Sequence, residues 1–384
     1  MQGDQKRPIY LALSGGGTRA MAFHAGVLKF LAEESALERV KAISTVSGGS
    51  LLTGVIFHLS GYRWPSSTDY LDNIFPKVEQ LLSDRFVEYK VGYARFLPDI
   101  PMIRKNAHWL TKLIEQEWGV NGRWSDIPNK PKWTVNVTNA ETGKRVTFSG
   151  KLLECYQVGK TNAENFRLAN ILSASAAVPG VIGPWILDVD HEKWKKPSKL
   201  VSKNPDLLDR LNQLHLYDGG LYDNLGLEEF VNVGSGIKKA YRDGVVLVSD
   251  AGKPIDQKFD RSVINPMRAY DILAIPMDQT RALRIRDFKG HLRKGPGSGA
   301  HIRLGESYKS LKKKATESKE TKDFDFSPLE GMSWQDQLSV DEVASVGTRL
   351  QGYRKKDLDR IIQHGYEAAR VSLFIEGISP IKEK

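Results

Sequence analysis

The stretch that decides the fold is Ile43-Ser44-Thr45-Val46-Ser47-Gly48-Gly49-Ser50-Leu51-Leu52. An apolar run ends at Ser47, two glycines allow a sharp turn, and apolar residues then recur at helical spacing as far as Leu59. A serine on such a strand-to-helix turn stands clear of the sheet, with its hydroxyl near the positive end of the next helix. On this window alone, a nucleophile and a helix cap are equally good interpretations of Ser47.

The preceding segment has the same strand-turn-helix pattern. Residues 9–13 form a short apolar run, Ser14-Gly15-Gly16-Gly17-Thr18-Arg19 predicts a turn, and a helix is predicted over 20–33. The next strand is predicted over 40–46, so the two strands form a βαβ unit and run parallel. Both glycine-rich turns therefore open at the carboxyl edge of one sheet, where open α/β sheets bind ligands.

The rest of the chain alternates predicted strands and helices. We therefore predict a single α/β domain over 1–384, a three-layer fold with a central, mainly parallel sheet flanked by helices. Further strands are predicted at 133–139, 145–149, 214–217 and 245–249, and a small-residue helix at 166–177.

Four segments are expected to lie outside this core. They are a mostly helical insertion at 62–131, a charged insertion at 188–213, a basic flexible arm at 281–325 and a C-terminal helical region at 337–384. The arm is expected to be flexible because it is too polar to build a core.

The charge is strongly uneven along the chain. The formal net charge is +10, and residues 281–322 alone carry 13 Lys or Arg against 4 Asp or Glu. Such an excess favours an acidic partner, namely an anionic membrane surface reached through the basic arm, with nucleic acid as the less favoured choice. No apolar run reaches the roughly 18–20 residues of a membrane span, and the first residues lack an apolar signal core. We therefore expect a cytoplasmic protein, peripheral at the inner membrane face.

Two further sequence features suit a serine hydrolase, which needs a base for its nucleophile and donors for an oxyanion. Asp218 ends a predicted strand and is followed by two glycines, so its carboxylate can approach a serine as a general base. An Asp-Gly turn without a catalytic role is the alternative. Gly15-Gly16-Gly17 leaves backbone N–H groups free to face an anion, or forms only a tight turn.

The only cysteine is Cys155, which excludes an intrachain disulfide and a cysteine-based zinc site.

Taken together and in this order, four motifs resemble the patatin-like phospholipases, including their bacterial members with a Ser-Asp dyad. The motifs are Gly15-Gly16-Gly17-Thr18-Arg19, Thr45-Val46-Ser47-Gly48-Gly49, Ala174-Ser175-Ala176-Ala177-Val178-Pro179 and Asp218-Gly219-Gly220-Leu221-Tyr222-Asp223-Asn224. The resemblance spans roughly residues 9–227. It implies a serine lipid acyl hydrolase of the phospholipase A type, with a phospholipid substrate and neither cofactor nor metal.

The resemblance also implies a role for each matching residue. Ser47 is the nucleophile and Asp218 its general base, without a histidine. The remaining assignments are an oxyanion loop of Gly15, Gly16 and Gly17, with Gly16 and Gly17 donating and Gly15 and Arg19 shaping the loop; an elbow of Thr45, Gly48 and Gly49; and an acyl pocket lined by Ser175 and Pro179. Thr45 departs from the family, which has glycine at the first position of its G-x-S-x-G elbow, and Ala20 stands where a glycine often closes the first motif.

The strongest alternative is a dinucleotide-binding α/β protein, because Gly15-x-Gly17-x-x-Ala20 fits such a turn. That fold requires an acidic residue at the end of the second strand, where this chain has Ser47. A catalytically inert basic protein that binds a membrane or nucleic acid is the other alternative.

Other residues compete for the catalytic roles. His24 or His215 would complete a Ser-His-Asp triad, and Asp250 is a second base candidate at a strand end. Ser173 and Ser175 are nucleophile candidates only in name, because no turn exposes them.

Overall fold

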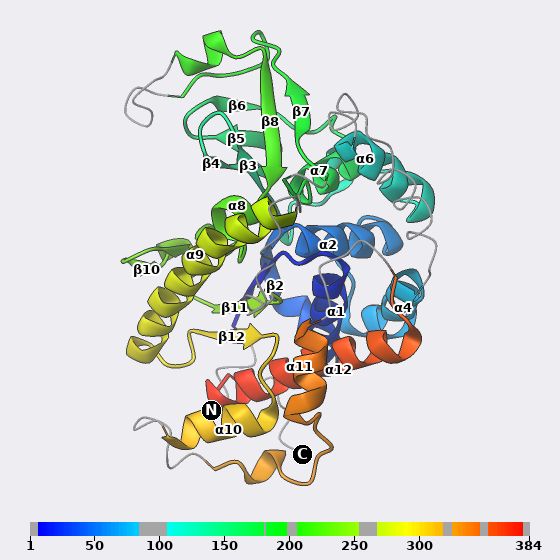
Figure 1. Cartoon of the computed structure of the whole chain (residues 1–384), viewed down its shortest axis with the longest axis vertical. Helices are drawn as coiled ribbons and strands as arrows, with labels where there is room; N and C mark the ends of the chain where they lie inside the picture. The colour runs from blue at the N-terminus through cyan, green and yellow to red at the C-terminus, as the bar shows by residue number, and fades with distance from the viewer. Residues whose placement is uncertain are drawn as a thin grey trace.

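The structure, a computed structural model, describes residues 7–83, 106–179, 182–197, 206–252, 267–317, 325–345 and 352–378. Its centre is a mixed ten-stranded sheet with helices on both faces (Figure 1). Five neighbouring strands run parallel, in the order β12-β11-β1-β2-β3. They are β1 (Ile9–Leu13), β2 (Val40–Val46), β3 (Lys132–Asn139), β11 (Val245–Asp250) and β12 (Gly299–Arg303). The predicted three-layer α/β architecture is therefore confirmed.

From β3 to β6 the sheet continues as antiparallel strands joined by short turns, which leave no room for a crossover helix, and β8, paired with β7, runs antiparallel along the other edge of β3. The predicted hairpin of β3 and β4 is present, whereas β5 and β6 were not predicted. These strands are β4 (Lys144–Ser149), β5 (Leu152–Cys155), β6 (Gly159–Asn162), β7 (Trp185–Asp188) and β8 (Gln213–Asp218), while β9 (Val231–Asn232) and β10 (Gly236–Ile237) form a separate ribbon.

The edge of β3 that faces β2 is shared by two strands. Val46, the last residue of β2, pairs with Asn136 in parallel register, and Asp218, the last residue of β8, pairs with Val137 in antiparallel register. Since β2 and β8 run in opposite directions along this edge, their carboxyl ends meet.

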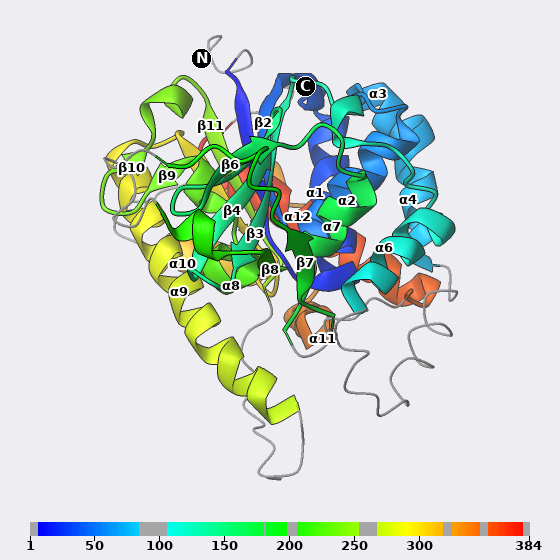
Figure 2. The same cartoon turned by 90° about the horizontal axis from the view of Figure 1, so that it is seen from above.

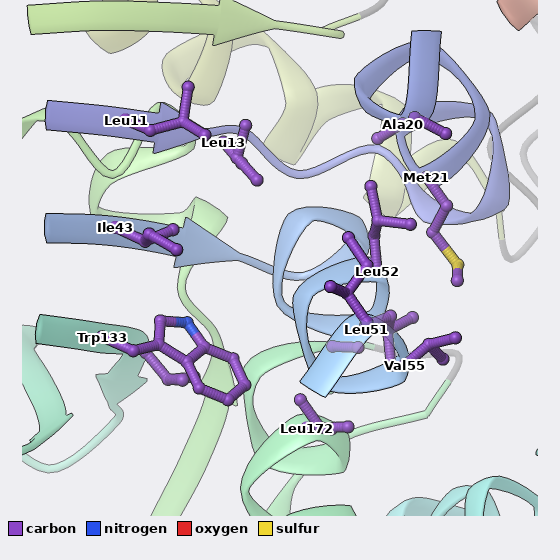
Figure 3. Packing of buried hydrophobic residues seen from close by; sticks show 14 of the residues in the cluster. Leu11, Leu13, Ala20, Met21, Ile43, Leu51, Leu52, Val55, Trp133 and Leu172 are labelled. Atoms are coloured by element: carbon purple, nitrogen blue, oxygen red, sulfur yellow. The ribbon is translucent and has the colours of Figure 1, made fainter. Parts of the chain in front are cut away.

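The core lies on both faces of the parallel strands. Side chains of Ile9, Leu11 and Leu13 point into one apolar cluster and those of Tyr10 and Ala12 into another, as the alternation of a strand requires. Four helices cover the first face: α1 (Gly17–Glu33), α2 (Gly48–Leu59), α7 (Leu168–Ser175) and α12 (Lys355–Ile375). The short α8 (Gly220–Asp223) and the long α9 (Met267–Lys294) lie on the second. Figure 3 shows apolar side chains of α2 between Met21 of α1 and Leu172 of α7, with Trp133 of β3 to one side.

The small residues of α1 allow a close contact with α12. A Cβ on Gly26 would lie 1.9 Å from the carbonyl oxygen of Ile362, and one on Gly365 would lie 2.0 Å from that of Phe23. Through these glycines, α12 of the C-terminal helical region packs directly on α1.

The insertion expected at 62–131 contains several helices and turns joined by irregular segments in its described residues, and residues 84–105 lie outside the described part. It contains α3 (Ser67–Asp69), a π-helical turn (Tyr70–Ile74), α4 (Phe75–Ser83), α6 (Asn106–Glu117) and a 3-10 turn (Trp124–Asp126). The charged insertion contributes a 3-10 turn (Leu207–Arg210), with residues 198–205 outside the description. In the C-terminal region, α11 (Gln337–Ser345) precedes α12, and residues 346–351 and 379–384 are outside it. Further 3-10 turns are Leu37–Arg39, Leu227–Glu229, Lys239–Tyr241 and Ser327–Leu329.

The structure differs from the expected flexible arm at 281–325. Residues 281–294 complete α9, β12 adds a strand to the parallel sheet, and α10 (Tyr308–Glu317) follows, while residues 318–324 lie outside the described part. Ala300 and Ile302 of β12 have no exposed surface. The high average charge of the segment concealed this five-residue strand, because its apolar side chains alternate with His301 and Arg303.

Candidate active site

Ser47 lies on a sharp turn between β2 and α2. Its backbone has φ 49° and ψ −117°, and its side chain makes no capping hydrogen bond to α2. The two glycines after it are required by space, since a Cβ on Gly48 would lie 2.3 Å from the carbonyl oxygen of Gly17 and one on Gly49 would lie 2.4 Å from that of Leu13. The hydroxyl is therefore not used as a helix cap, and the turn packs directly against the glycine loop, residues 14–19.

The side chain of Ser47 lies near the carboxylate of Asp218, close enough to lower the pKa of that carboxyl group. Both side chains are nearly buried, with Ser47 5% and Asp218 6% exposed. Burial raises the pKa of Asp218 to about 6, against the opposing effects of the Gly220 N–H, which donates to Oδ1 at 2.7 Å, and of Ser47. A carboxylate with a raised pKa is a stronger base than one in water, which suits proton abstraction from a serine.

The glycine loop lies beside Ser47. A Cβ on Gly15 would lie 3.1 Å from the Cβ of Ser47, and the Gly15 N–H donates to the carbonyl oxygen of Asn224 at 3.0 Å. Gly16 and Gly17 have φ 138° and 61°, in the region that favours glycine, and α1 begins at Gly17. Their N–H groups precede the first intrahelical bonds of α1, so the helix itself offers them no acceptor.

Two buried side chains hold the glycine loop from behind. Arg19, 1% exposed, donates to the carbonyl oxygens of Ala251 and Ala344, at 3.0 and 3.3 Å. His24 lies 2.9 Å from the carbonyl oxygen of Ser14 through Nε2 and 2.7 Å from Ser249 Oγ through Nδ1. Its Nε2 therefore carries the proton, because a carbonyl oxygen only accepts.

The other residues assigned to the site lie under or beside the elbow. Thr45 has no exposed surface and its hydroxyl lies 2.8 Å from Ser50 Oγ. Ser175 is also wholly buried, and its Oγ accepts from the Ser47 N–H at 3.0 Å. Ser175 therefore supports the turn from below and does not line an open acyl pocket as expected. Pro179 is partly buried in the segment that follows α7.

The competing candidates have other partners. His215 of β8 is paired with Glu141 at 2.6 Å. Asp250 is paired with Arg281 at 3.0 Å. Arg281 and His301 hold the pKa of Asp250 well below its usual range, although burial alone would raise it. Ser173 donates to the carbonyl oxygen of Ala107. The structure brings Ser47 together with Asp218 and leaves these residues apart from it.

The site also contains two asparagines that the sequence analysis did not assign to it. Asn136 of β3 donates through Nδ2 to the Thr45 carbonyl oxygen at 2.8 Å. The Oδ1 of Asn224 lies 2.4 Å from where a Cβ on Gly15 would be. Asn136 carried no signal of its own, because polar residues alternate with apolar ones along β3, and Asn224 ends the Asp218 motif.

The sequence matches the family described as patatin-like phospholipase over residues 11–231, more than half of the chain. The chain belongs to the patatin-like phospholipase family. The matched region includes the glycine loop, the Ser47 elbow and Asp218. In the dinucleotide alternative, the glycine loop would face a pyrophosphate; here it faces the elbow of the family's nucleophile motif.

Similar solved structures include a human GIVD cytosolic phospholipase A2, at 13% sequence identity and a TM-score of 0.48. That alignment covers 98% of this chain and 60% of the human chain. VipD from Legionella pneumophila is 13% identical with a TM-score of 0.39, covering 95% of this chain and 66% of VipD. This chain thus spans about 60% of the length of the human protein. No curated protein matches it.

None of the helices in the described ranges has both the length and the hydropathy needed to cross a bilayer. The same part of the chain contains no group of three or more His, Cys, Asp or Glu side chains placed to hold a metal ion.

Proposed function

We propose that the chain is a serine lipid acyl hydrolase of the phospholipase A type, which cleaves ester bonds of phospholipids through a Ser47-Asp218 dyad. The observation that carries this proposal is the meeting of the carboxyl ends of β2 and β8, which places the nearly buried Ser47 and Asp218 side chains next to each other. A serine hydroxyl in water is a poor nucleophile, and an adjacent carboxylate that accepts its proton activates it.

In the first half of the reaction, Ser47 Oγ attacks the ester carbonyl carbon and its proton passes to Asp218. The resulting oxyanion binds the N–H groups of Gly16 and Gly17 at the start of α1, where the helix dipole adds favourable charge. Collapse of this intermediate breaks the bond to the alcohol, which leaves as a lysophospholipid with the proton from Asp218. The acyl group remains on Ser47.

In the second half, a water molecule gives a proton to Asp218 and attacks the acyl carbon. The second tetrahedral intermediate uses the same two N–H groups. Its collapse releases a fatty acid and returns the proton to Ser47. No step requires a metal or a cofactor.

A fluorophosphonate probe tests the proposal directly, because it reacts with an activated serine and loses fluoride. We expect labelling of the wild-type protein and none of Ser47→Ala. Asp218→Asn keeps an acceptor for the Gly220 N–H but removes the base, and should lower both labelling and phospholipid hydrolysis by roughly 10²–10⁴-fold. Labelling that survives Ser47→Ala, or lipid hydrolysis unchanged in both variants, would remove the proposal.

The proposed substrate is reached at an anionic membrane surface, and α9 provides the supporting feature. Arg281 of α9 contacts Asp250 at the carboxyl end of β11. The residues of α9 before Arg281 therefore extend beyond the edge of the sheet where Ser47 lies, and this part of the helix projects from the rest of the molecule (Figure 2). Ile272 (51%) and Ile275 (45%) are exposed on this part of α9, and Leu283 (59%) is exposed just after Arg281. Exposed basic side chains follow on the same helix, at Arg286, Lys289 and Lys294. Apolar and basic groups together favour an anionic lipid surface over nucleic acid.

Vesicle flotation tests this part separately. In a Ser47→Ala background, which leaves the lipids intact, the protein should float with vesicles of phosphatidylcholine and phosphatidylglycerol and much less with phosphatidylcholine alone. The double change Ile272→Ser/Ile275→Ser should reduce flotation, while Val233→Ser, at a 65% exposed position of the β9-β10 ribbon, should not. Equal flotation of both variants, or retention on DNA without vesicle binding, would contradict the membrane role.

A further inference from the structure

The backbone of Ser47 needs support, because φ 49° and ψ −117° is a conformation that few L-residues adopt. Such a conformation is strained and persists only where the surrounding structure holds it. Its carbonyl oxygen accepts from the Leu51 N–H at 2.9 Å, which is the ordinary first bond of α2. Its N–H donates to Ser175 Oγ at 3.0 Å. The second bond is specific to this turn, and it offsets part of the strain.

Ser175 Oγ is the last of three hydroxyls in a row beneath the elbow. Trp133 Nε1 donates to Thr45 Oγ1 at 2.9 Å, and Thr45 Oγ1 lies 2.8 Å from Ser50 Oγ. Ser50 Oγ lies 2.8 Å from Ser175 Oγ, which donates to the carbonyl oxygen of Asn136 at 2.8 Å. The three hydroxyl residues have no exposed surface, so water cannot replace a lost partner.

The number of protons sets the direction of this chain. The indole of Trp133 only donates, the carbonyl of Asn136 only accepts, and each hydroxyl has one proton to give. Every member is satisfied when Thr45 donates to Ser50, Ser50 to Ser175 and Ser175 to Asn136. The oxygen of Ser175 then accepts two bonds, from Ser50 and from the Ser47 N–H. Bonds aligned head to tail in a buried site strengthen one another, so the chain makes Ser175 a better acceptor for Ser47.

The same end of α7 also holds the base. The carbonyl oxygen of Ser175 accepts from the Gly219 N–H at 3.4 Å, and that of Ala177 accepts from the Asp218 N–H at 3.0 Å. Ser175 thus contacts the nucleophile turn through its side chain and the base turn through its main chain. One residue therefore influences the relative position of Ser47 and Asp218.

We propose that Thr45, Ser50 and Ser175 are positioning residues, whose hydroxyl chain holds Ser47 in the conformation that its attack requires. This inference rests on the proposed hydrolase function. It also gives a role to Thr45, which stands where the family elbow has a glycine. The Thr45 hydroxyl accepts a hydrogen bond from Trp133 Nε1 and donates one to Ser50. In this chain the departure from glycine is part of the site's construction.

The most direct test compares the variants Thr45→Val and Thr45→Ser. Valine keeps the shape of threonine and removes the hydroxyl, whereas serine keeps the hydroxyl and removes only a methyl group. We expect Thr45→Val and Ser175→Ala to lower kcat and the rate of fluorophosphonate labelling by roughly 10- to 100-fold with KM little changed, because misplacement of a reacting atom acts on the chemical step. Thr45→Ser should remain near wild type. Thr45→Gly, which restores the family residue, should lower kcat like Thr45→Val.

A matched control separates positioning from general loss of stability. Ser173 lies on α7 two residues before Ser175, is equally buried, and donates a hydrogen bond to Ala107 away from the elbow. Ser173→Ala should lower the melting temperature without lowering kcat. If a variant fails to fold, Ser50→Ala provides a second interruption of the chain. The pH at half-maximal activity should stay near that of the wild type in Thr45→Val, since the chain acts on Ser47 and not on the charge of Asp218.

The outcomes distinguish this inference from the proposed function. If Ser47→Ala abolishes labelling while Thr45→Val, Thr45→Gly and Ser175→Ala label at the wild-type rate, the hydrolase stands and the positioning role is overturned. If Ser173→Ala lowers kcat as much as Ser175→Ala, the effect is only loss of stability and the positioning role is also overturned. If labelling persists in Ser47→Ala, the function itself has failed.

Discussion

Val46 and Asp218 are the last residues of two strands that meet end to end along one edge of β3, where they pair with Asn136 and Val137. The residue after Val46 is Ser47, so the head-on meeting of a parallel and an antiparallel strand places a hydroxyl against a carboxylate. In a fully parallel sheet, neighbouring strand ends would point the same way, and the carboxylate would have to reach sideways. The junction between the parallel and antiparallel parts of the sheet is therefore what assembles the proposed dyad.

The first prediction concerns pH. Asp218 acts as a base only when ionised, and burial raises its pKa to about 6. We expect kcat/KM to be nearly constant from pH 7 to 9 and to fall tenfold per pH unit well below pH 6. The profile is measured with a soluble ester, and a return to pH 7.5 after each exposure controls for unfolding. A single acidic limb centred near pH 4 would contradict the raised pKa.

The second prediction concerns the stability of Asp218→Asn. The pKa of Asp218 is higher in the folded chain, about 6, than the ordinary 3.8, so burial of the ionised form destabilises the fold. This penalty is absent below pH 3.8 and complete above pH 6. At pH 7, Asp218→Asn should therefore raise the free energy of unfolding by about 1–3 kcal/mol while it removes activity. Urea unfolding at pH 7.5 and pH 4 measures the difference, and a gain that does not shrink at pH 4 would contradict this cause.

The third prediction concerns the contact of α1 with α12. A Cβ on Gly26 would lie 1.9 Å from the carbonyl oxygen of Ile362, and a main-chain atom cannot rotate away. Gly26→Ala should therefore lower the free energy of unfolding by about 3 kcal/mol or more. Gly290→Ala is the matched control, since nothing lies within 4 Å of its Cβ in α9, and should stabilise by about 0.5–1 kcal/mol. Equal effects of the two changes would refute the close packing.

The fourth prediction concerns acid stability. Burial lowers the pKa of both His24 and His364 to about 4, against the ordinary 6.5. Each is neutral when folded, so its contribution to stability is complete above pH 6.5 and is lost as pH falls towards 4, by at most about 3 kcal/mol per histidine. His364→Gln should flatten the fall in unfolding free energy between pH 6.5 and 4, while the exposed His191→Gln should not. Identical pH slopes for wild type and His364→Gln would rule out this role of His364.

Much of the fold followed from local sequence patterns. The alternation of strands and glycine turns from Ile9 to Val46 predicted β1, α1 and β2 as a parallel unit, and α12 lies within the helical region predicted at 337–384. β12 was missed because its five residues lie within a segment whose average charge conceals them, and a strand of this length is recognised mainly by the neighbour that it pairs with. Average composition is a poor guide where a short buried strand is flanked by charged helices.

By itself, the sequence determined which chemical groups are available and in which order: a glycine loop, a serine on a glycine turn and an aspartate at a strand end. These are local properties, set by turn geometry and by the residue types that tolerate it. Tertiary structure alone decided that Asp218 meets Ser47 head-on, that Ser175 lies beneath the elbow, and that Thr45 completes a hydrogen-bonded chain with Ser50. Those relationships depend on strand register and on the complete burial of three hydroxyls from distant segments, and no spacing along the chain encodes either of them.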